Sequence, residues 1–144
     1  MQGIKRKVVH AVLFEILAVL STTIIFMAAT DHGVGRSGSL ALVTSLVALL
    51  WNMLYNTAFE RWEARQTRRG RSLLRRATHT LGFEAGLVLL LLPPIAWWLE
   101  ISVGLALSLE AGMVVYFLIY GFVYNWCFDH LFGLPDSARH AAKS

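Results

Sequence analysis

Residues 10–15 read HAVLFE and residues 79–84 read HTLGFE, and both segments lie inside apolar stretches of the chain. The same offset of 69 residues relates residues 55–60, YNTAFE, to residues 124–129, YNWCFD. Shared Leu and Val would show only that two halves have the same helix plan. Shared His, Glu and Asn in apolar segments indicate a duplicated polar site. The chain is therefore predicted to consist of two tandem repeats of one unit.

The composition identifies the solvent in which the chain folds. Hydrophobic residues make up 56% of the 144 residues, charged residues only 15%, and the mean hydropathy is +0.56. A soluble domain of this size cannot bury so much apolar surface. The apolar runs reach the ~20 residues that a helix needs to cross ~30 Å of hydrocarbon. The sequence therefore predicts an all-α membrane protein with four transmembrane helices, at about residues 8–30, 39–59, 77–98 and 102–128.

Each repeat holds two of these helices. The first transmembrane pair is predicted over residues 1–69 and the second over residues 70–144. Short connections favour antiparallel packing of consecutive helices. Because each pair leaves and returns on the same side, the hairpins are parallel repeats, and alternating access would come from rocking of the pairs or from an oligomer. Four helices make a thin wall for a drug-sized pathway, so a homodimer is a hypothesis.

Basic residues predict the orientation. Of the 13 Lys and Arg, Arg36 alone lies in the connections within the two helix pairs. Positive charge is enriched on the cytoplasmic side of membranes, so both termini and the central connection are predicted to be cytoplasmic. The same bias accounts for the pI of about 9.6, and no nucleic-acid partner is inferred. The residues that carry this prediction are Lys5, Arg6, Lys7, Arg61, Arg65, Arg68, Arg69, Arg71, Arg75, Arg76, Arg139 and Lys143.

A carboxyl group lies deep in each repeat. Glu15 follows the start of the first predicted helix by about seven residues, which at ~1.5 Å per residue puts it ~10 Å below the membrane boundary. Glu84 is at the matching depth of the third predicted helix. An acidic residue at mid-helix costs ~2.5–3.5 kcal/mol on insertion, so both side chains are expected to face the bundle interior. There, either a proton or a bound cation would neutralise the carboxylate.

The second predicted helix carries a stripe of amide and aromatic side chains: Trp51, Asn52, Tyr55, Asn56 and Phe59. We expect this stripe to face the first helix, where it would surround Glu15. The two Asn residues fit either interhelical hydrogen bonds or substrate contact. Phe14 and Phe59 fit packing as well as recognition, and His10 fits either a proton relay or an interfacial position.

The second repeat supplies an imperfect copy, with Tyr120, Tyr124 and Asn125 on the fourth predicted helix. Asn52 corresponds to Gly121, so one amide is lost at the level of the carboxyl group and the two acids need not be equivalent. Glu110 is a third acid, and Ala41 stands at the corresponding place of the first repeat. Glu110 fits either the lining of an outward opening or an interfacial position after a short helix.

No enzyme chemistry is indicated. The sequence shows no nucleophile paired with a base and no phosphate-binding loop. Its single cysteine, Cys127, cannot form an intramolecular disulfide, and its five His lack the close pairing or Cys partners of a metal site. We therefore expect neither a metal nor another cofactor.

Four segments in order resemble the signature motifs of the proteobacterial antimicrobial compound efflux family, whose members consist of two tandem bacterial transmembrane pair domains. The resemblance covers nearly the whole chain. Lys7 stands where the family favours Arg, and Glu60 stands where it favours Asp, and both changes keep the charge. The segments are His10-Ala11-x-x-Phe14-Glu15, Trp51-Asn52-x-x-Tyr55-Asn56-x-x-Phe59, Arg76-x-x-His79-x-x-x-Phe83-Glu84 and Tyr120-x-x-x-Tyr124-Asn125-Trp126-x-Phe128-Asp129.

The resemblance implies proton-coupled efflux of cationic antimicrobial compounds, such as chlorhexidine and acridine dyes, across the bacterial inner membrane. Some members export short diamines, which are the alternative main substrate. Glu15 matches the functional acid of the family, and Glu84 is its copy. The motif positions expected to bind substrate or support the acids are His10, Phe14, Trp51, Asn52, Tyr55, Asn56, Phe59, Glu60, His79, Tyr120, Tyr124, Asn125 and Asp129.

Two other functions fit the same residues. A small proton or cation channel would use the buried acids without coupling proton flow to a substrate. A non-transporting membrane protein would use the polar layer only as interhelical hydrogen bonds. In the latter case Glu15→Gln would leave function intact.

Overall fold

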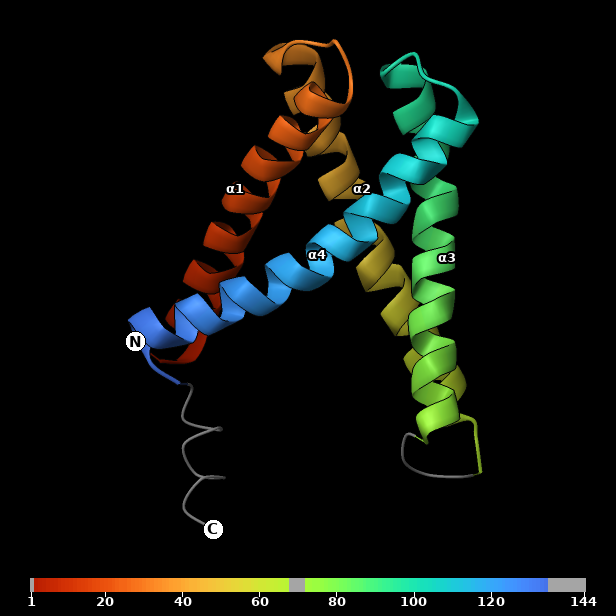
Figure 1. Ribbon diagram of the computed structural model, residues 1–144. Coiled ribbons are helices and arrows are strands. Elements are labelled where there is room, and N and C mark those ends of the chain that lie inside the picture. The colour runs from red at the N-terminus through yellow and green to blue at the C-terminus, as the bar shows by residue number, and fades with distance from the viewer. Residues whose placement is uncertain (1, 68–71, 135–144) are drawn as a thin grey trace.

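The computed structural model describes residues 2–67 and 72–134, and this part of the chain forms four helices (Figure 1). They are α1 (Gly3–Ala29), α2 (Val34–Ala64), α3 (Leu73–Trp98) and α4 (Val103–Phe132). All four are long and apolar enough to cross a membrane, which confirms the predicted all-α class. On the side of the termini and the central connection, each helix extends past its predicted run, because an apolar run marks the hydrocarbon and a helix continues into the headgroup region.

Local signals fix several helix ends. The side chain of Ser72 accepts a hydrogen bond from the backbone N–H of Arg75 at 3.2 Å, and Ser102 accepts one from Leu105 at 3.1 Å. Such N-caps satisfy donors that the first helical turn leaves free. α4 is followed by Gly133, whose φ of 77° favours glycine because glycine has no Cβ.

The helices form a ring rather than a solid bundle. In Figure 1, α1 and α3 stand apart, and α2 and α4 run diagonally between them in opposite directions. Among the described residues, each helix packs against two others, in the order α1–α2–α3–α4 and back to α1. The pairs α1/α3 and α2/α4 make no close backbone contact within that part of the chain. Space is therefore left at the centre of the ring.

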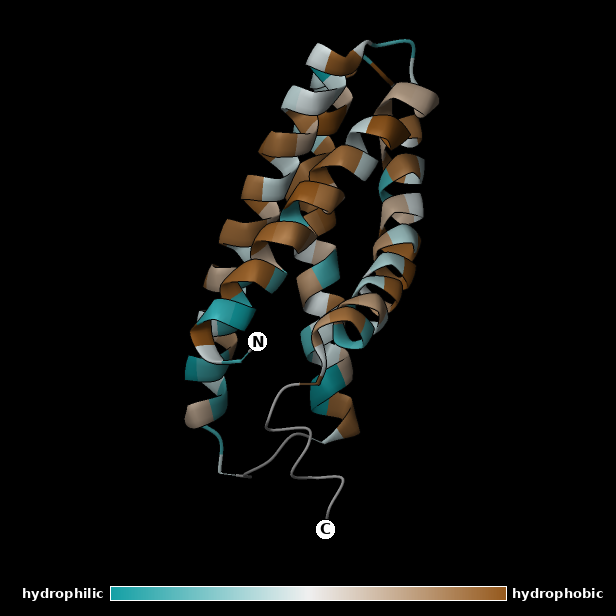
Figure 2. Cartoon of the chain, turned by 90° about the vertical axis from the view of Figure 1, so that its left-hand side faces the viewer, coloured by the Kyte–Doolittle hydropathy of each residue, from teal (hydrophilic) through white to brown (hydrophobic). Residues whose placement is uncertain are grey.

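The tightest packing lies at one end of the molecule. We call it the connection end, because the α1–α2 and α3–α4 connections lie there; the opposite end, with both termini, is the terminal end (Figure 1). Elsewhere Tyr124 and Phe128 are buried, but many large apolar side chains are exposed. Figure 2 shows apolar residues along most of each helix, as a lipid-facing surface requires. The buried cluster at the connection end consists of Phe26, Leu40, Ala41, Ile95, Leu99 and Ala106.

Polar contacts join the two connections to each other. His32 Nε2 donates to the carbonyl of Leu99 at 2.6 Å, and Arg36 Nε donates to the carbonyl of Trp98 at 2.7 Å. The Arg36 guanidinium also pairs with Glu100 at 2.9 Å. These bonds join one hairpin to the other next to the buried cluster, and no sequence motif predicts this contact.

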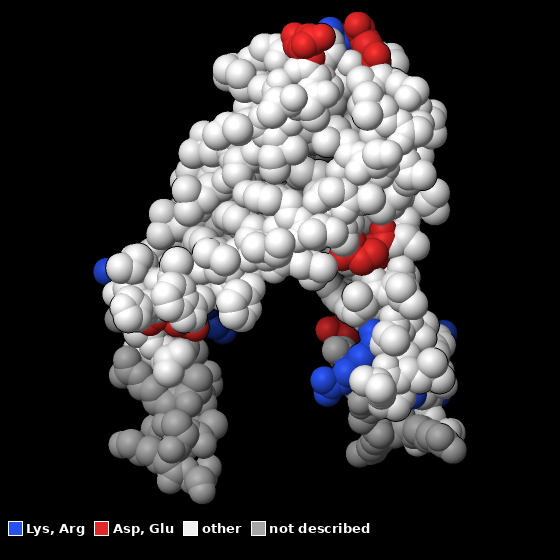
Figure 3. All heavy atoms as spheres, in the orientation of Figure 1, with Lys and Arg blue, Asp and Glu red and all other residues white. Residues whose placement is uncertain are grey.

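Basic side chains gather at the terminal end, as Figure 3 shows. This distribution agrees with the charge bias from which the orientation was predicted. Arg68, Arg69, Arg71, Arg139 and Lys143, which contributed to that prediction, lie outside the described residues.

Candidate functional site

The ring encloses a cavity of about 510 Å³ that all four helices line. Most of its wall is apolar. Its aromatic side chains are Phe14, Phe26, Phe83 and Phe117. None of the described lining residues is Lys, Arg or His, so the acids of the wall face no basic side chain there. The polar side chains of the wall are Glu15, Thr22, Thr44, Ser45, Asn52, Glu84 and Glu110.

Three acidic residues, on three different helices, thus line one cavity. Glu15 of α1 and Glu84 of α3 each lie about 14 residues, or ~21 Å of helix, from the connection end. Glu110 of α4 lies about seven residues, or ~10 Å, from the same end. Glu15 is exposed within the chain, Glu84 is half-buried, and Glu110 is buried with 4% of its surface exposed. The cavity is therefore acidic at two depths.

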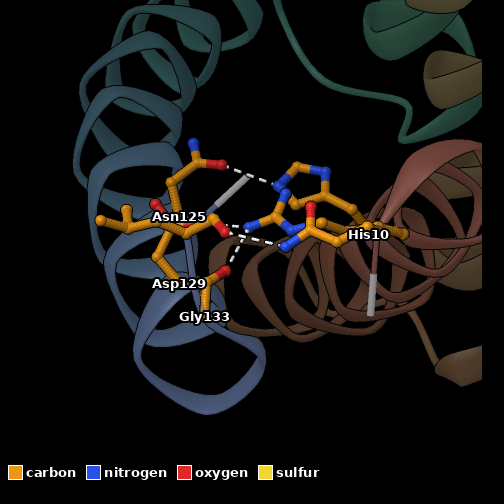
Figure 4. A network of polar contacts seen from close by, with 7 residues as sticks. His10, Asn125, Asp129 and Gly133 are labelled. Atoms are coloured by element: carbon orange, nitrogen blue, oxygen red, sulfur yellow. Dashed lines mark hydrogen bonds and ion pairs between the residues drawn. The ribbon is translucent and has the colours of Figure 1, made fainter. Parts of the chain in front are cut away.

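Near the terminal end, α1 is joined to α4 by side chains of the repeated motifs (Figure 4). The Tyr124 hydroxyl donates to the carbonyl of His10 at 2.7 Å, and the Tyr120 hydroxyl donates to the carbonyl of Phe14 at 2.8 Å. The ring nitrogen Nε2 of His10 lies 2.8 Å from Asn125 Oδ1, to which it donates. These bonds hold the backbone just before Glu15 against α4.

The same contacts recur between α2 and α3. The Tyr55 hydroxyl donates to the carbonyl of His79 at 2.8 Å, and Trp51 Nε1 donates to the carbonyl of Phe83 at 3.0 Å. His79 Nε2 donates to Asn56 Oδ1 at 2.9 Å. Each of these bonds matches one on the α1–α4 side at the offset of 69 residues. The two repeats are therefore related by approximate twofold symmetry, and each motif pair joins helices of different repeats.

The prediction that the second-helix stripe faces the first helix is wrong for Trp51, Tyr55 and Asn56, whose side chains bond to α3. In a ring of two parallel hairpins, the second helix of one repeat meets the first helix of the other at the terminal end. Trp51 and Tyr55 consequently do not line the cavity. Phe14, Phe83 and Phe117 supply its aromatic surface near the acids, and Phe117 was not predicted.

The two asparagines of the stripe differ in position. Asn52 lines the cavity, whereas Asn56 lies against α3 through His79. The Asn56 amide also donates to Asn52 Oδ1 at 2.7 Å, which links the helix contact to the cavity wall. Phe59 stacks edge-on against His79, with ring centroids 4.5 Å apart. Asn56 therefore makes the expected interhelical hydrogen bond, whereas Asn52 lies where a substrate in the cavity could contact it.

The acids that end the two repeated motifs are not equivalent in space. Asp129 pairs with Arg6 of α1, and the same guanidinium donates to the carbonyl of Gly133 at 2.9 Å (Figure 4). Glu60 is exposed, and on its side of the molecule Arg75 instead pairs with Glu63 at 3.6 Å. Neither Glu60 nor Asp129 lines the cavity.

Arg6→Ala is expected to destabilise the α1–α4 contact by about 1–2 kcal/mol, because it removes hydrogen bonds of a charged, partly buried donor. The Arg6 side chain is 12% exposed and its guanidinium lies 5.0 Å from the centre of the Phe128 ring. The melting temperature of detergent-purified protein measures the effect. Lys5→Ala, which alters an exposed neighbour, is the control. Equal melting temperatures of the two variants would contradict a stabilising role of Arg6.

Two glycines of α3 let α2 approach closely. A Cβ at Gly86 would overlap the ring of Trp51, and one at Gly82 would overlap the hydroxyl of Tyr55. Leu17 and Leu13 stand at the corresponding places of α1, so the repeat did not reveal this requirement. The α2–α3 contact therefore depends on two glycines that the first repeat does not share.

Gly86→Ala is expected to cost about 1–3 kcal/mol, because the rigid Trp51 ring must move and its bond to the Phe83 carbonyl is lost. Gly112→Ala is the matched control, since nothing lies within 4 Å of a Cβ added there. Thermal unfolding in detergent and tryptophan fluorescence would be compared for the two variants. If Gly86→Ala and Gly112→Ala melted alike, the close approach would not be required.

Comparisons with known proteins agree with the duplicated fold. The BTP family model, described as chlorhexidine efflux transporter, matches residues 2–65 and again residues 71–134. No solved structure matches the chain significantly.

Three curated relatives are similar over most of their length, and each is named short-chain diamines transporter. The protein from Vibrio parahaemolyticus is 45% identical over 126 residues, which cover 85% of this chain and 87% of the relative. Those from Acinetobacter baylyi and Acinetobacter baumannii are each 31% identical, over 87% and 88% of this chain and 88% of each relative. With two copies of the family unit and relatives of matching length, this chain belongs to the chlorhexidine efflux transporter family, the proteobacterial antimicrobial compound efflux family of membrane transporters.

Proposed function

We propose that this protein is a proton-coupled exporter of organic cations in the bacterial inner membrane. One observation carries the proposal: a single cavity of about 510 Å³ is lined by Glu15, Glu84 and Glu110 and by none of the described basic residues. Unpaired carboxylates in hydrocarbon are costly, so each must be neutralised by a proton or by a cation. An organic cation that enters such a site displaces protons, and proton return displaces the cation.

The proposed orientation places the terminal end in the cytoplasm, because basic side chains gather there. Figure 3 shows the molecule divided at that end, with a cleft between two parts that we call legs: the α1–α4 pair and the α2–α3 pair. The connection end is closed by the buried cluster around Phe26 and by the contacts of Arg36 with the other hairpin. The cavity is thus proposed to be open to the cytoplasm in this conformation.

Opening of the other side would have to separate the two hairpins at the connection end. The legs at the terminal end are the α1–α4 pair and the α2–α3 pair, each held by the motif hydrogen bonds. We propose that His10 and Asn125 hold α1 against α4, and that His79 and Asn56 hold α3 against α2. Alternating access would then require the α1–α4 and α2–α3 pairs to close together at the terminal end while the two hairpins separate at the connection end, with Glu15 in one pair and Glu84 in the other.

Short-chain diamines are the first proposed substrates. The relatives that bear this name include one that is 45% identical to this chain, and several acids in one cavity suit a ligand with two ammonium groups. Chlorhexidine is the second candidate, because the family description names it and a cavity of this volume is within the range that binds drug-sized molecules. Phe14, Phe83 and Phe117 offer aromatic surface to either compound.

Proton release tests the function directly. Purified protein in weakly buffered detergent solution receives 1,5-diaminopentane or chlorhexidine while a pH-sensitive dye is followed. Release that saturates with ligand supports cation–proton exchange, and the more effective compound identifies the substrate class. Asp31→Asn, which alters an exposed acid outside the cavity, should behave as wild type. Absence of release with both compounds would exclude the antiport proposal and favour a channel or a structural role.

A further inference from the structure

Glu110 is the most deeply buried acid of the described chain, and its burial is unexplained by any contact. Its side chain is 4% exposed, and both carboxylate oxygens are buried without a hydrogen-bond partner among the described residues. Buried carboxyl groups in stable proteins are almost always hydrogen-bonded or paired, since an orphaned one costs several kcal/mol. Either a proton or a bound cation would neutralise such a group, and a bound cation with N–H donors would also supply the missing hydrogen bonds.

Glu110 is among the residues that line the same cavity as Glu15 and Glu84, and its carboxylate oxygens lie buried in that wall. Glu15 comes from α1 and Glu84 from α3. The polar residues that α2 contributes to the cavity wall, among them Thr44 and Asn52, are uncharged. By helix rise, Glu110 lies ~10 Å nearer the connection end than either acid. A positive group bound beside Glu110 would therefore not be repelled by any described basic side chain of the cavity wall. It would also lie well apart from a second positive group bound at Glu15 or Glu84.

A packing role does not account for the residue. Ala41 occupies the corresponding place in the first repeat, is 1% exposed, and belongs to the buried apolar cluster. The fold thus accepts a small apolar side chain at this position of a repeat. Helix stability does not require the acid either, because Glu110 lies beyond the first turn of α4 and caps nothing.

We infer that Glu110 binds one ammonium group of a dicationic substrate while Glu15 or Glu84 binds the other. This inference rests on the proposed function and narrows its substrate class to linear dications. The two depths of negative charge set the selectivity: a monoamine satisfies only one acid, whereas a diamine of suitable length satisfies both. Charge-assisted hydrogen bonds at Glu110 would supply the partners that its two oxygens lack.

Isothermal titration calorimetry with purified full-length protein tests the inference, using 1,5-diaminopentane and pentylamine as ligands of equal carbon number. Glu110→Gln keeps the volume of the side chain and removes its charge. We expect the Kd of the diamine to rise about tenfold or more, and that of pentylamine to change less than about twofold. Asp31→Asn is the control acid, exposed and outside the cavity.

Two further variants keep the result decisive. Glu110→Ala introduces the residue of the first repeat and replaces Glu110→Gln if that variant does not fold, as judged by gel filtration. Glu110→Asp should restore part of the preference for the diamine. Equal Kd changes for both amines, or none, would overturn the assignment of Glu110 while wild-type diamine binding upheld the proposed function. Failure of the wild type to bind any diamine or to release protons would overturn both.

Discussion

Glu15→Gln is expected to abolish ligand-driven proton release and to lower export by at least about tenfold, the largest effect of any single substitution in the cavity. Gln keeps the shape of the side chain but carries neither a titratable proton nor a negative charge. The competition between proton and cation at this position is therefore lost, and with it the coupling of their fluxes. The cavity itself should persist, since the Glu15 side chain holds no structural hydrogen bond among the contacts of the described residues.

Glu84→Gln is the informative companion, because the repeats differ around the two acids. Asn52 lies on α2, beside the helix that carries Glu84, whereas Gly121 occupies the corresponding place on α4 beside α1. Glu15 is also the more exposed of the two acids. We expect Glu84→Gln to weaken ligand binding and to retain part of the proton release.

Proton release and uptake of 1,5-diaminopentane into inside-out vesicles would be measured for wild type, Glu15→Gln, Glu84→Gln and the control Asp31→Asn. A Glu15→Gln variant that released protons at the wild-type level would contradict the assigned role. Ligand-independent ion flow through wild type would point instead to a channel.

Phe26→Ala is expected to open the connection end and to destabilise the protein by about 2 kcal/mol or more. Phe26 is 1% exposed and packs in the cluster that includes Leu40, Ile95 and Leu99. Removing a buried ring loses transfer free energy and leaves a cavity. In a membrane the transfer part is small, because lipid is as apolar as the core, but the lost packing remains. The void joins the central cavity, which Phe26 also lines.

Thiol labelling measures the opening. Ala48 lines the cavity, so Ala48→Cys in a Cys127→Ser background reports access when a membrane-impermeant maleimide is added on the side of the connection end. We expect Phe26→Ala to be labelled about tenfold faster, equivalent to ~1.4 kcal/mol in favour of the open form. Phe122→Ala is the control, since Phe122 is 74% exposed. Equal labelling rates for the two variants would show that the cluster does not seal the cavity.

Several features were predictable because they depend on single segments. Four spanning helices follow from runs of apolar residues, whose length is set by the bilayer. The placement of Glu15 and Glu84 inside the ring follows from the cost of an acid in hydrocarbon, and both acids do line the cavity. For Glu110 the sequence fits a lining position and an interfacial position equally well, since helix position alone does not show which side of α4 faces a cavity.

The sequence by itself determined that the chain folds in a membrane, that its helical hairpin is duplicated, and which acids lie deep in the helices. Hydropathy, repeat spacing and charge can all be read along the chain in order. Tertiary structure alone decided which helices meet. Trp51 and Tyr55 face α3 rather than α1, and Gly82 and Gly86 make room for them. Two parallel hairpins can close a ring in more than one way, and the bonds that select this one join residues far apart in the chain. The physical reason is that an i, i+4 stripe fixes the face of a helix, whereas its partner is chosen by side-chain fit across the ring.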